Sequence, residues 1–170
     1  MAVLRIREYP DPILKRPAEP VDRIDDTVRR LLDDMLETMY RAPGIGLAAP
    51  QVGVSKRIVV VDVSEQKNAP LRLVNPRITW RSEILVAAEE GCLSLPDQYA
   101  EVKRPEAVEV VYLDECGVER SLEAEGLLAR CLQHEIDHLD GILFIDRLSP
   151  LKRSMVLRRL TKARRLRASA

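Results

Sequence analysis

Both histidines of the chain, His134 and His138, lie within one five-residue stretch, and Glu135 directly follows the first of them. Residues four apart lie on the same face of a helix, so the two imidazoles can bind one metal ion. A bound metal lowers the pKa of its water, and Glu135 is placed to take the proton and complete a hydroxide nucleophile. This HExxH pattern predicts metal-dependent hydrolysis. The simpler alternative is a pair of surface histidines beside a glutamate.

A catalytic metal site usually needs a third protein ligand. The 32 residues after His138 contain only two acids, and Phe144 occupies the position where the longer HExxHxxGxxH motif has its last histidine. We therefore expect the third ligand upstream, and the thiols of Cys92 and Cys131 are the candidates. Cys131 belongs to an apolar run, where a free cysteine is usually a core residue. Cys92 follows a glycine outside any expected helix, and spacing alone favours it only modestly.

A third unusual stretch, residues 44–53, reads GIGLAAPQVG and holds three of the seven glycines. It lacks the ending of a phosphate-binding loop, and a tight turn leading into a sheet is the simpler interpretation. Its small residues permit close backbone approach to a ligand. The amide of Gln51, beside a metal site, could stabilise a developing oxyanion.

The elements that must position these residues follow from the hydrophobic spacing and the prolines. Four prolines in the first twenty residues favour an extended arm. Apolar residues at helical spacing then predict a helix that Asp25 or Asp26 can cap and that Pro43-Gly44 ends. Helical spacing returns over residues 125–140, and Ser149-Pro150 starts a last helix. Closely spaced β-branched runs between the helices imply mostly antiparallel strands. These strands are expected at residues 57–63, 72–74, 83–88, 100–103, 107–113 and 118–124. We therefore expect an α+β fold whose sheets pack around a central metal-binding helix, followed by a C-terminal helix.

The composition is that of a globular protein. Basic and acidic residues number 27 each, hydrophobic residues make up 46%, and the length fits one domain. No run is long and apolar enough to span a bilayer, and the N-terminus does not resemble a secretory signal. The three cysteines are then expected as free thiols or ligands in the cytoplasm.

The three unusual stretches together resemble the peptide deformylase family, whose motifs are GxGxAAxQ, EGCxS and HExxH in that order. Here they stand as Gly44–Gln51, Glu90–Ser94 and His134–His138. The resemblance extends over nearly the whole chain, including the proline-rich start and the LSPLKR segment, and is closest to the bacterial form with a C-terminal helix. It implies a cytoplasmic bacterial hydrolase that removes the N-terminal formyl group from formylmethionyl nascent polypeptides and releases formate.

The resemblance also implies a role for each motif residue. It makes Cys92, His134 and His138 the ligands of one divalent metal, usually Fe²⁺, which Zn²⁺, Ni²⁺ or Co²⁺ can replace. Glu135 would be the general base and then the acid, while Gln51 and the backbone N–H of Leu93 would stabilise the oxyanion. The peptide and its methionine side chain would be bound by Gly44, Ile45, Gly46, Glu90, Gly91, Leu127 and Cys131.

Two other functions are open on the sequence alone. An HExxH metalloprotease would cleave unformylated peptides, and a non-enzymatic metal-binding or ribosome-binding module would show no turnover.

The zero net charge conceals an uneven distribution. Residues 151–170 carry eight basic residues and no acid, so residues 1–150 sum to −8. We expect a catalytic part, 1–150, and a basic helical tail, 151–170, of the same monomeric domain. The tail is either a solvated helix face or a contact to ribosomal RNA near the nascent chain.

Overall fold

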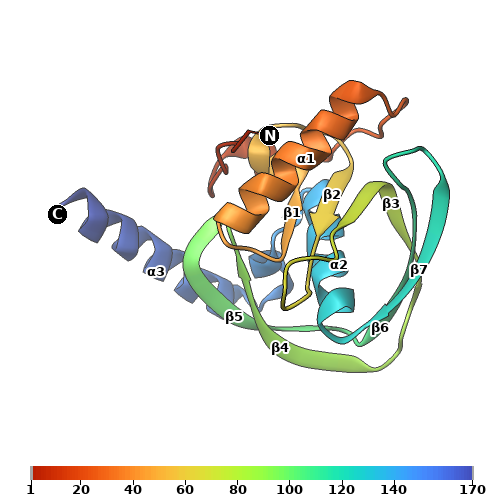
Figure 1. Ribbon diagram of the computed structural model, residues 1–170. Helices are drawn as coiled ribbons and strands as arrows, with labels where there is room; N and C mark the ends of the chain where they lie inside the picture. Colours follow the sequence, from red (N-terminus) through yellow and green to blue (C-terminus); the bar gives the residue numbers. More distant parts are fainter. Residues whose placement is uncertain (1, 170) are drawn as a thin grey trace.

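Helix α2, Gly126–Leu139, carries the HExxH residues and passes through the centre of the molecule (Figure 1). The structure, a computed structural model, describes residues 2–169. Its elements form an α+β fold with two antiparallel sheets, as expected from the sequence. Every residue of α2 from Cys131 to Leu139 is buried. The HExxH motif is therefore part of the core, and not a surface feature.

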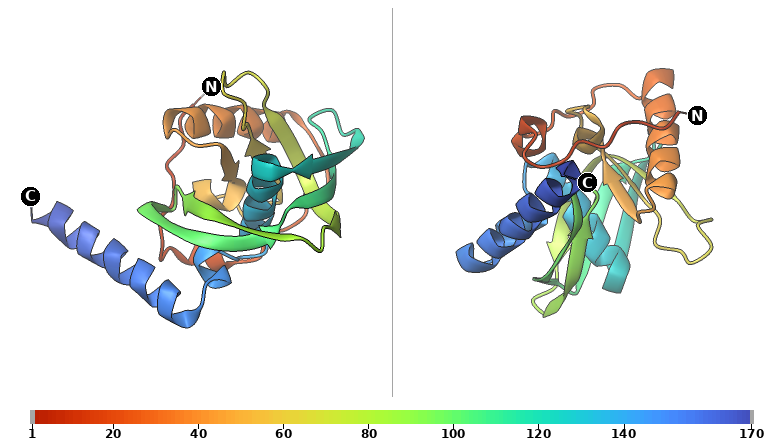
Figure 2. Two further views of the ribbon diagram at one scale, coloured as in Figure 1. Left: turned by 90° about the horizontal axis from the view of Figure 1, so that it is seen from below. Right: turned by 90° about the vertical axis from the view of Figure 1, so that its left-hand side faces the viewer.

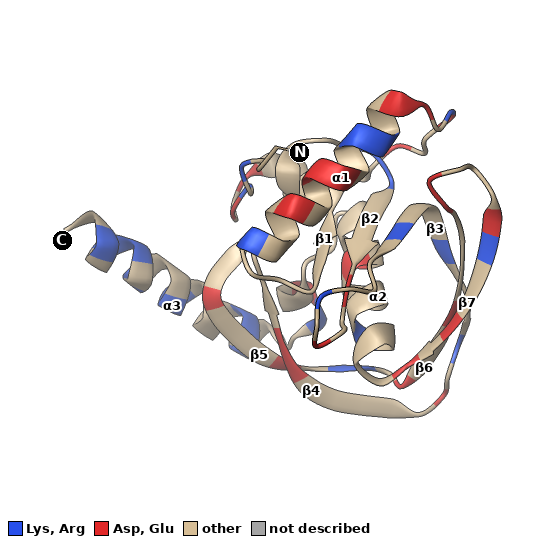
Figure 3. Ribbon diagram, viewed as in Figure 1, with Lys and Arg blue, Asp and Glu red and all other residues tan. Residues whose placement is uncertain are grey.

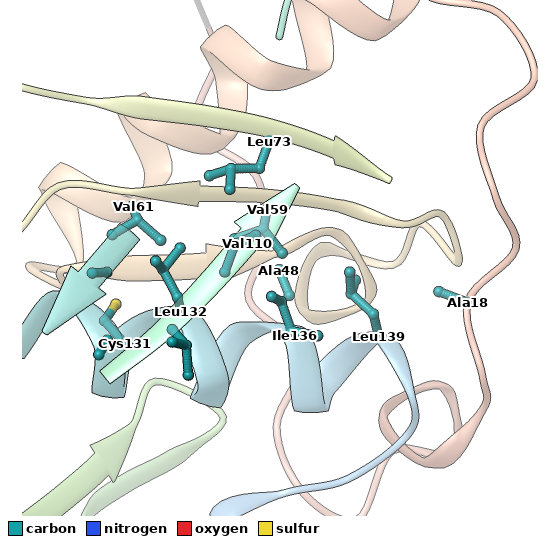
Figure 4. Packing of buried hydrophobic residues seen from close by; sticks show 13 residues of the cluster. Ala18, Ala48, Val59, Val61, Leu73, Val110, Cys131, Leu132, Ile136 and Leu139 are labelled. Carbon is teal, nitrogen blue, oxygen red and sulfur yellow. The ribbon is translucent and has the colours of Figure 1, made fainter. Parts of the chain in front are cut away.

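The larger sheet has five strands in the order β1-β2-β3-β6-β7, and all neighbouring strands are antiparallel. The strands are β1 (Gly46–Ala48), β2 (Ile58–Val61), β3 (Leu71–Arg81), β6 (Ala107–Leu113) and β7 (Glu119–Glu125). Val59 and Val61 of β2 pack with Leu132 and Ile136 of α2 (Figure 4). The alternate residues of β2 pack instead with helix α1, Asp26–Arg41. A strand buried on both faces explains the continuous β-branched run in the sequence.

The second sheet is a hairpin of β4, Leu85–Cys92, and β5, Leu95–Pro105. Helix α3, Pro150–Ala168, packs against β5 by burying Val156 and Leu160 in a cluster with Leu95 and Phe144. Beyond these contacts α3 extends away from the rest of the molecule (Figure 2). Basic residues occur along most of the length of α3 (Figure 3), and most of them are exposed. No helix in residues 2–169 has the length and hydropathy needed to cross a membrane.

The expected helices are confirmed, but strands β3 and β5 are longer than expected and continue through prolines. Strand β3 continues through Pro76, because a register shift between Val74 and Arg77 absorbs the missing N–H. Strand β5 runs through Pro96 to Pro105 in a two-stranded sheet, where one edge is free of ladder bonds.

Two short elements also differ from the expectations. The N-terminal arm contains a 3-10 turn, Pro12–Lys15, because Asp11 caps it and proline suits its first position. The glycine-rich stretch is a strand, β1, followed by a 3-10 turn, Ala49–Val52, and is not a simple turn.

Candidate metal centre and active site

Three side chains from two elements converge on one point. Cys92 ends β4, where the hairpin register shifts, and His134 and His138 come from successive turns of α2. The Sγ atom of Cys92 lies 3.3 Å from Nε2 of His138, and one ligand atom from each residue lies within 4.8 Å of the others. A sulfur and two imidazole nitrogens form a donor set that suits zinc or ferrous iron. These three residues could therefore hold a metal ion.

The two imidazoles differ in what their Nδ1 atoms contact. Nδ1 of His134 lies 2.9 Å from Oε1 of the Glu90 carboxylate, so its Nε2 is left for a metal ion. Nδ1 of His138 is buried and has no hydrogen-bond partner among the described residues. Burial lowers the pKa of His138 well below its usual range, and the ring is then neutral, the form that binds metals.

The question between the two cysteines is decided by position. Cys131 is buried in the core cluster, where its thiol donates to the carbonyl oxygen of Ile45 at 3.6 Å. Burial raises the pKa of the Cys131 thiol well above its usual value. Cys131 therefore stays neutral within the core. Of the two cysteines, Cys92 is the one whose sulfur lies beside the two histidines.

A buried chain of charged groups lies behind His134. The carboxylate of Glu90 accepts two hydrogen bonds from Arg104, at 2.6 and 3.0 Å, and Arg104 also donates to Asp137 at 2.9 Å. Asp137 accepts two further bonds from Arg147. Because these bonds satisfy both buried carboxylates, Glu90 holds the His134 ring in one orientation.

Glu135 lies against the glycine strand. A Cβ on Gly46 would lie 2.5 Å from Oε2 of Glu135 and 2.7 Å from Sγ of Cys131, so only glycine leaves room there. Burial raises the pKa of Glu135 to about 7. Its Oε1 atom is buried and has no partner among the described residues. A carboxyl group in this state can take or give a proton near neutral pH.

Gln51 is held with its amide group beside the sulfur ligand. Its Oε1 accepts from the backbone N–H of Ala48 at 2.9 Å, which fixes the rotamer. Its Nε2 lies 3.5 Å from Sγ of Cys92 and donates to Ser94 at 3.1 Å. Leu93 follows Cys92 in the turn between β4 and β5, so its backbone belongs to the same edge of the site. Both residues expected to stabilise an oxyanion therefore lie next to the candidate metal ligands.

Two connected hollows surround these groups. A cleft of about 740 Å³ contains Glu135, Gln51 and Cys92 in its lining. A narrower pocket of about 110 Å³ adjoins it beside His134 and Glu135. The expected substrate residues line the cleft, the pocket or both: Gly44, Ile45, Gly46, Glu90, Gly91, Leu127 and Cys131.

The sequence interpretation missed the charged residues behind the ligands, above all Arg104, Arg130 and Asp137. One signal was available in strand β5. Arg104 is in phase with Val102, and both side chains are buried, so a charged residue occupies the inward face of the strand. A charge at such a position requires a buried partner of opposite sign.

Comparisons with known proteins agree with this geometry. The family model described as Polypeptide deformylase matches residues 3–154. A peptide deformylase of Rhizobium meliloti (strain 1021) is 58% identical over 162 residues, which cover 94% of this chain and 93% of the relative. The crystal structure of a peptide deformylase from Legionella pneumophila has a TM-score of 0.94 and 47% identity over 99% of both chains. One from Synechococcus elongatus, in complex with actinonin, has a TM-score of 0.88 and 49% identity, and covers 92% of this chain and 86% of that one.

The match to the family model includes the glycine strand, the Cys92 hairpin and α2. The fold agrees with that of the Legionella pneumophila structure over nearly the whole chain. The chain therefore belongs to the peptide deformylase family of hydrolases.

Proposed function

We propose that the chain removes the formyl group from the N-terminus of N-formylmethionyl polypeptides and releases formate. The observation that carries the proposal is the convergence of three metal donors, a buried carboxyl group and an amide donor on one cleft. Membership in the family supplies the substrate class.

Cys92, His134 and His138 would hold one divalent metal ion, with Fe²⁺ as the physiological metal and Zn²⁺, Ni²⁺ or Co²⁺ as substitutes. When bound, the ion supplies Lewis-acid polarisation of the formyl carbonyl and lowers the pKa of a water. Glu90 keeps His134 in the orientation that presents Nε2. The ring of His138 is neutral, and its Nδ1 has no hydrogen-bond partner among the described residues, so it is also suited to bind a metal ion.

Glu135 would act as general base and then as general acid. Its carboxylate takes a proton from the attacking water and later gives it to the amine nitrogen of the leaving peptide. A pKa of about 7 matches both steps at neutral pH, because the two protonation states are then similarly populated.

The oxyanion that forms on the formyl oxygen needs donors placed in advance. The Nε2 group of Gln51 is held near Cys92 by the bond that Oε1 makes to Ala48. The backbone N–H of Leu93 is the second donor in this proposal. These two groups would lower the energy of the tetrahedral state.

The peptide would bind as an extra strand along β1, which is an edge strand of the five-stranded sheet and lines the cleft. The glycines at positions 44 and 46 let its backbone approach closely. The methionine side chain would then enter the narrow pocket between Ile45, Leu127 and Cys131.

Several expectations about the whole chain stay predictions. The division into a catalytic part, 1–150, and a basic tail, 151–170, is one of them, and so are the cytoplasmic location and the monomeric state. We propose that the tail contacts ribosomal RNA near the nascent chain. Its exposed basic face supports this, because a phosphate backbone attracts such a face.

The test is a product assay under strict anaerobiosis with Fe²⁺- or Ni²⁺-loaded protein. We expect formate from formyl-Met-Ala-Ser and none from acetyl-Met-Ala-Ser. Absence of formate from the formyl peptide would overturn the proposal. Cleavage of the peptide bonds of unformylated Met-Ala-Ser would favour a metalloprotease instead.

A further inference from the structure

Arg130 joins α2 to both strands of the β4–β5 hairpin. Its Nη1 donates to Oε2 of Glu90 at 2.6 Å and to the carbonyl oxygen of Val102 at 2.9 Å. Its Nη2 donates to the carbonyl oxygen of Val86 at 2.6 Å. The side chain is 11% exposed. Three hydrogen bonds to three different residues hold the guanidinium in one place, and the bond to Glu90 is charge-assisted.

The same residue lines the narrow pocket. Along α2, Arg130 lies one turn before His134 and two turns before His138. Along β4, its partner Val86 lies six residues before Cys92, at the opposite end of the strand. Arg130 therefore stands in the pocket wall between Leu127, about one turn earlier on α2, and His134, and its guanidinium is bonded to Glu90.

We propose that Arg130 is a specificity-determining residue whose guanidinium forms a fixed part of the pocket wall and limits how long a side chain the pocket admits. The inference rests on the proposed function, in which this pocket takes the methionine side chain. It adds what limits the length of that side chain.

The physical argument concerns how little this part of the pocket wall can move. An aliphatic residue in its place could change rotamer to admit one more methylene group. Arg130 cannot move without breaking its bond to Glu90, which is buried, and its bonds to two strand carbonyls. The guanidinium has five N–H groups, and these three bonds use three of them. Part of the pocket wall is thus rigid and polar, which disfavours a longer apolar side chain.

A homologous pair of substrates measures pocket depth directly. Formyl-ethionine-Ala-Ser differs from formyl-Met-Ala-Ser by one methylene group at the tip of the side chain. For the unmodified chain we expect the ethionine peptide to have a kcat/KM at least about 10-fold lower, since one methylene in a confined pocket is worth about 10–200-fold. In Arg130→Ala the ratio of kcat/KM for the methionine peptide to that for the ethionine peptide should move toward one by about fivefold or more.

Arg130→Lys keeps the positive charge and most of the stem, but it replaces the rigid fork with a flexible ammonium group. We expect this variant to fold and to lose part of the discrimination, by about twofold to threefold. The matched control is Arg147→Ala, which removes another arginine bound to a carboxylate on α2 but does not line the pocket. The ratio of its kcat/KM values for the two peptides should equal that of the unmodified chain. Metal content is measured for every variant.

A purely structural clamp would lower kcat/KM for both peptides by the same factor and leave their ratio unchanged. An unchanged ratio in Arg130→Lys, or in both variants, therefore overturns the inference while formate release from formyl-Met-Ala-Ser still supports the proposed function. Absence of formate from every formyl peptide overturns the proposed function and this inference with it.

Discussion

Replacing Arg104 with methionine removes the cation that joins the two buried carboxylates behind the metal donors. Arg104 donates to Glu90 at 2.6 and 3.0 Å and to Asp137 at 2.9 Å, and its side chain is 4% exposed. Methionine fills a similar length without any donor. Each carboxylate keeps one other cation, Arg130 on Glu90 and Arg147 on Asp137. The variant therefore weakens the network without leaving either carboxylate unpaired.

The magnitude follows from this partial compensation. Removing one partner of a buried ion pair costs about 3–5 kcal/mol, because it leaves a buried charge unmatched. Since both carboxylates keep a second cation, we expect a loss near the lower end, about 3 kcal/mol. For a chain of this size, that lowers the melting temperature by roughly 6–12 °C. Glu90 also orients His134, so metal affinity should fall by about 10–100-fold.

The assay is urea unfolding of metal-free protein together with metal-binding titration. The matched control is Arg41→Met, because Arg41 makes only an exposed i,i+4 pair with Glu37, worth about 0.3–0.5 kcal/mol. If Arg104→Met is no more destabilising than Arg41→Met, and its metal affinity is unchanged, the reasoning about the buried network is refuted.

The pH dependence gives the same prediction a second readout. Burial acts to raise the pKa of Glu90, but hydrogen bonds from His134 and Arg104 outweigh it and lower the pKa to about 2. Because this value lies below the unfolded value of 4.5, ionised Glu90 stabilises the fold above pH 4.5. That stabilisation is lost as pH falls from 4.5 toward 2. The difference between the unmodified chain and Arg104→Met should therefore shrink over this range, and a constant difference would contradict the assignment.

Three further predictions concern the base, the sulfur ligand and the tail. Gly46→Ala should place a methyl group against Glu135 and lower kcat at least tenfold, of the ~10²–10⁴-fold that a general base supplies. A normal kcat in the folded variant would refute this contact. The Fe²⁺-loaded chain should lose activity in air, because the Cys92 thiolate and its metal are open to oxidation; equal rates with and without air would count against it. Arg158→Glu combined with Arg159→Glu should weaken ribosome binding and flatten its salt dependence, while hydrolysis of short formyl peptides is unchanged. Unaltered ribosome binding would leave the tail as a solvated helix.

The tail prediction uses charge reversal because the structure changes what deletion would mean. From the sequence, residues 151–170 could be removed without affecting the catalytic part. In the structure, Val156 and Leu160 of α3 are buried against Leu95 and Phe144. Deletion would expose this cluster, whereas replacing exposed arginines leaves it intact.

The candidate metal donors could be found from the sequence. The two histidines lie one turn apart in one helix, and Cys92 belongs to a stretch that matches a family motif. The spacing of His134 and His138 predicts one helical face, and α2 confirms it. Spacing alone leaves the choice between Cys92 and Cys131 open, and the family resemblance points to Cys92. In the structure Cys92, at the end of β4 where the register shifts, lies beside the two histidines.

The supporting charges could not be placed from the sequence because their partners come from distant segments. Arg104 and Glu90 are 14 residues apart on two strands, and Arg104 reaches Asp137 across 33 residues. Spacing within one element says nothing about such contacts. The full lengths of β3 and β5 could not be predicted for a related reason. A strand can continue through a proline at a bulge or a free edge, and both are properties of the assembled sheet.

The most direct test of the central claim is the rate of formate release by Glu135→Gln, with the unmodified chain compared at the same measured metal content. Glutamine keeps the shape of the side chain but cannot accept the proton. The account predicts that the variant retains one equivalent of metal and that its kcat falls by about 10²–10⁴-fold. A metal-loaded variant whose kcat is within twofold of the unmodified chain would contradict it.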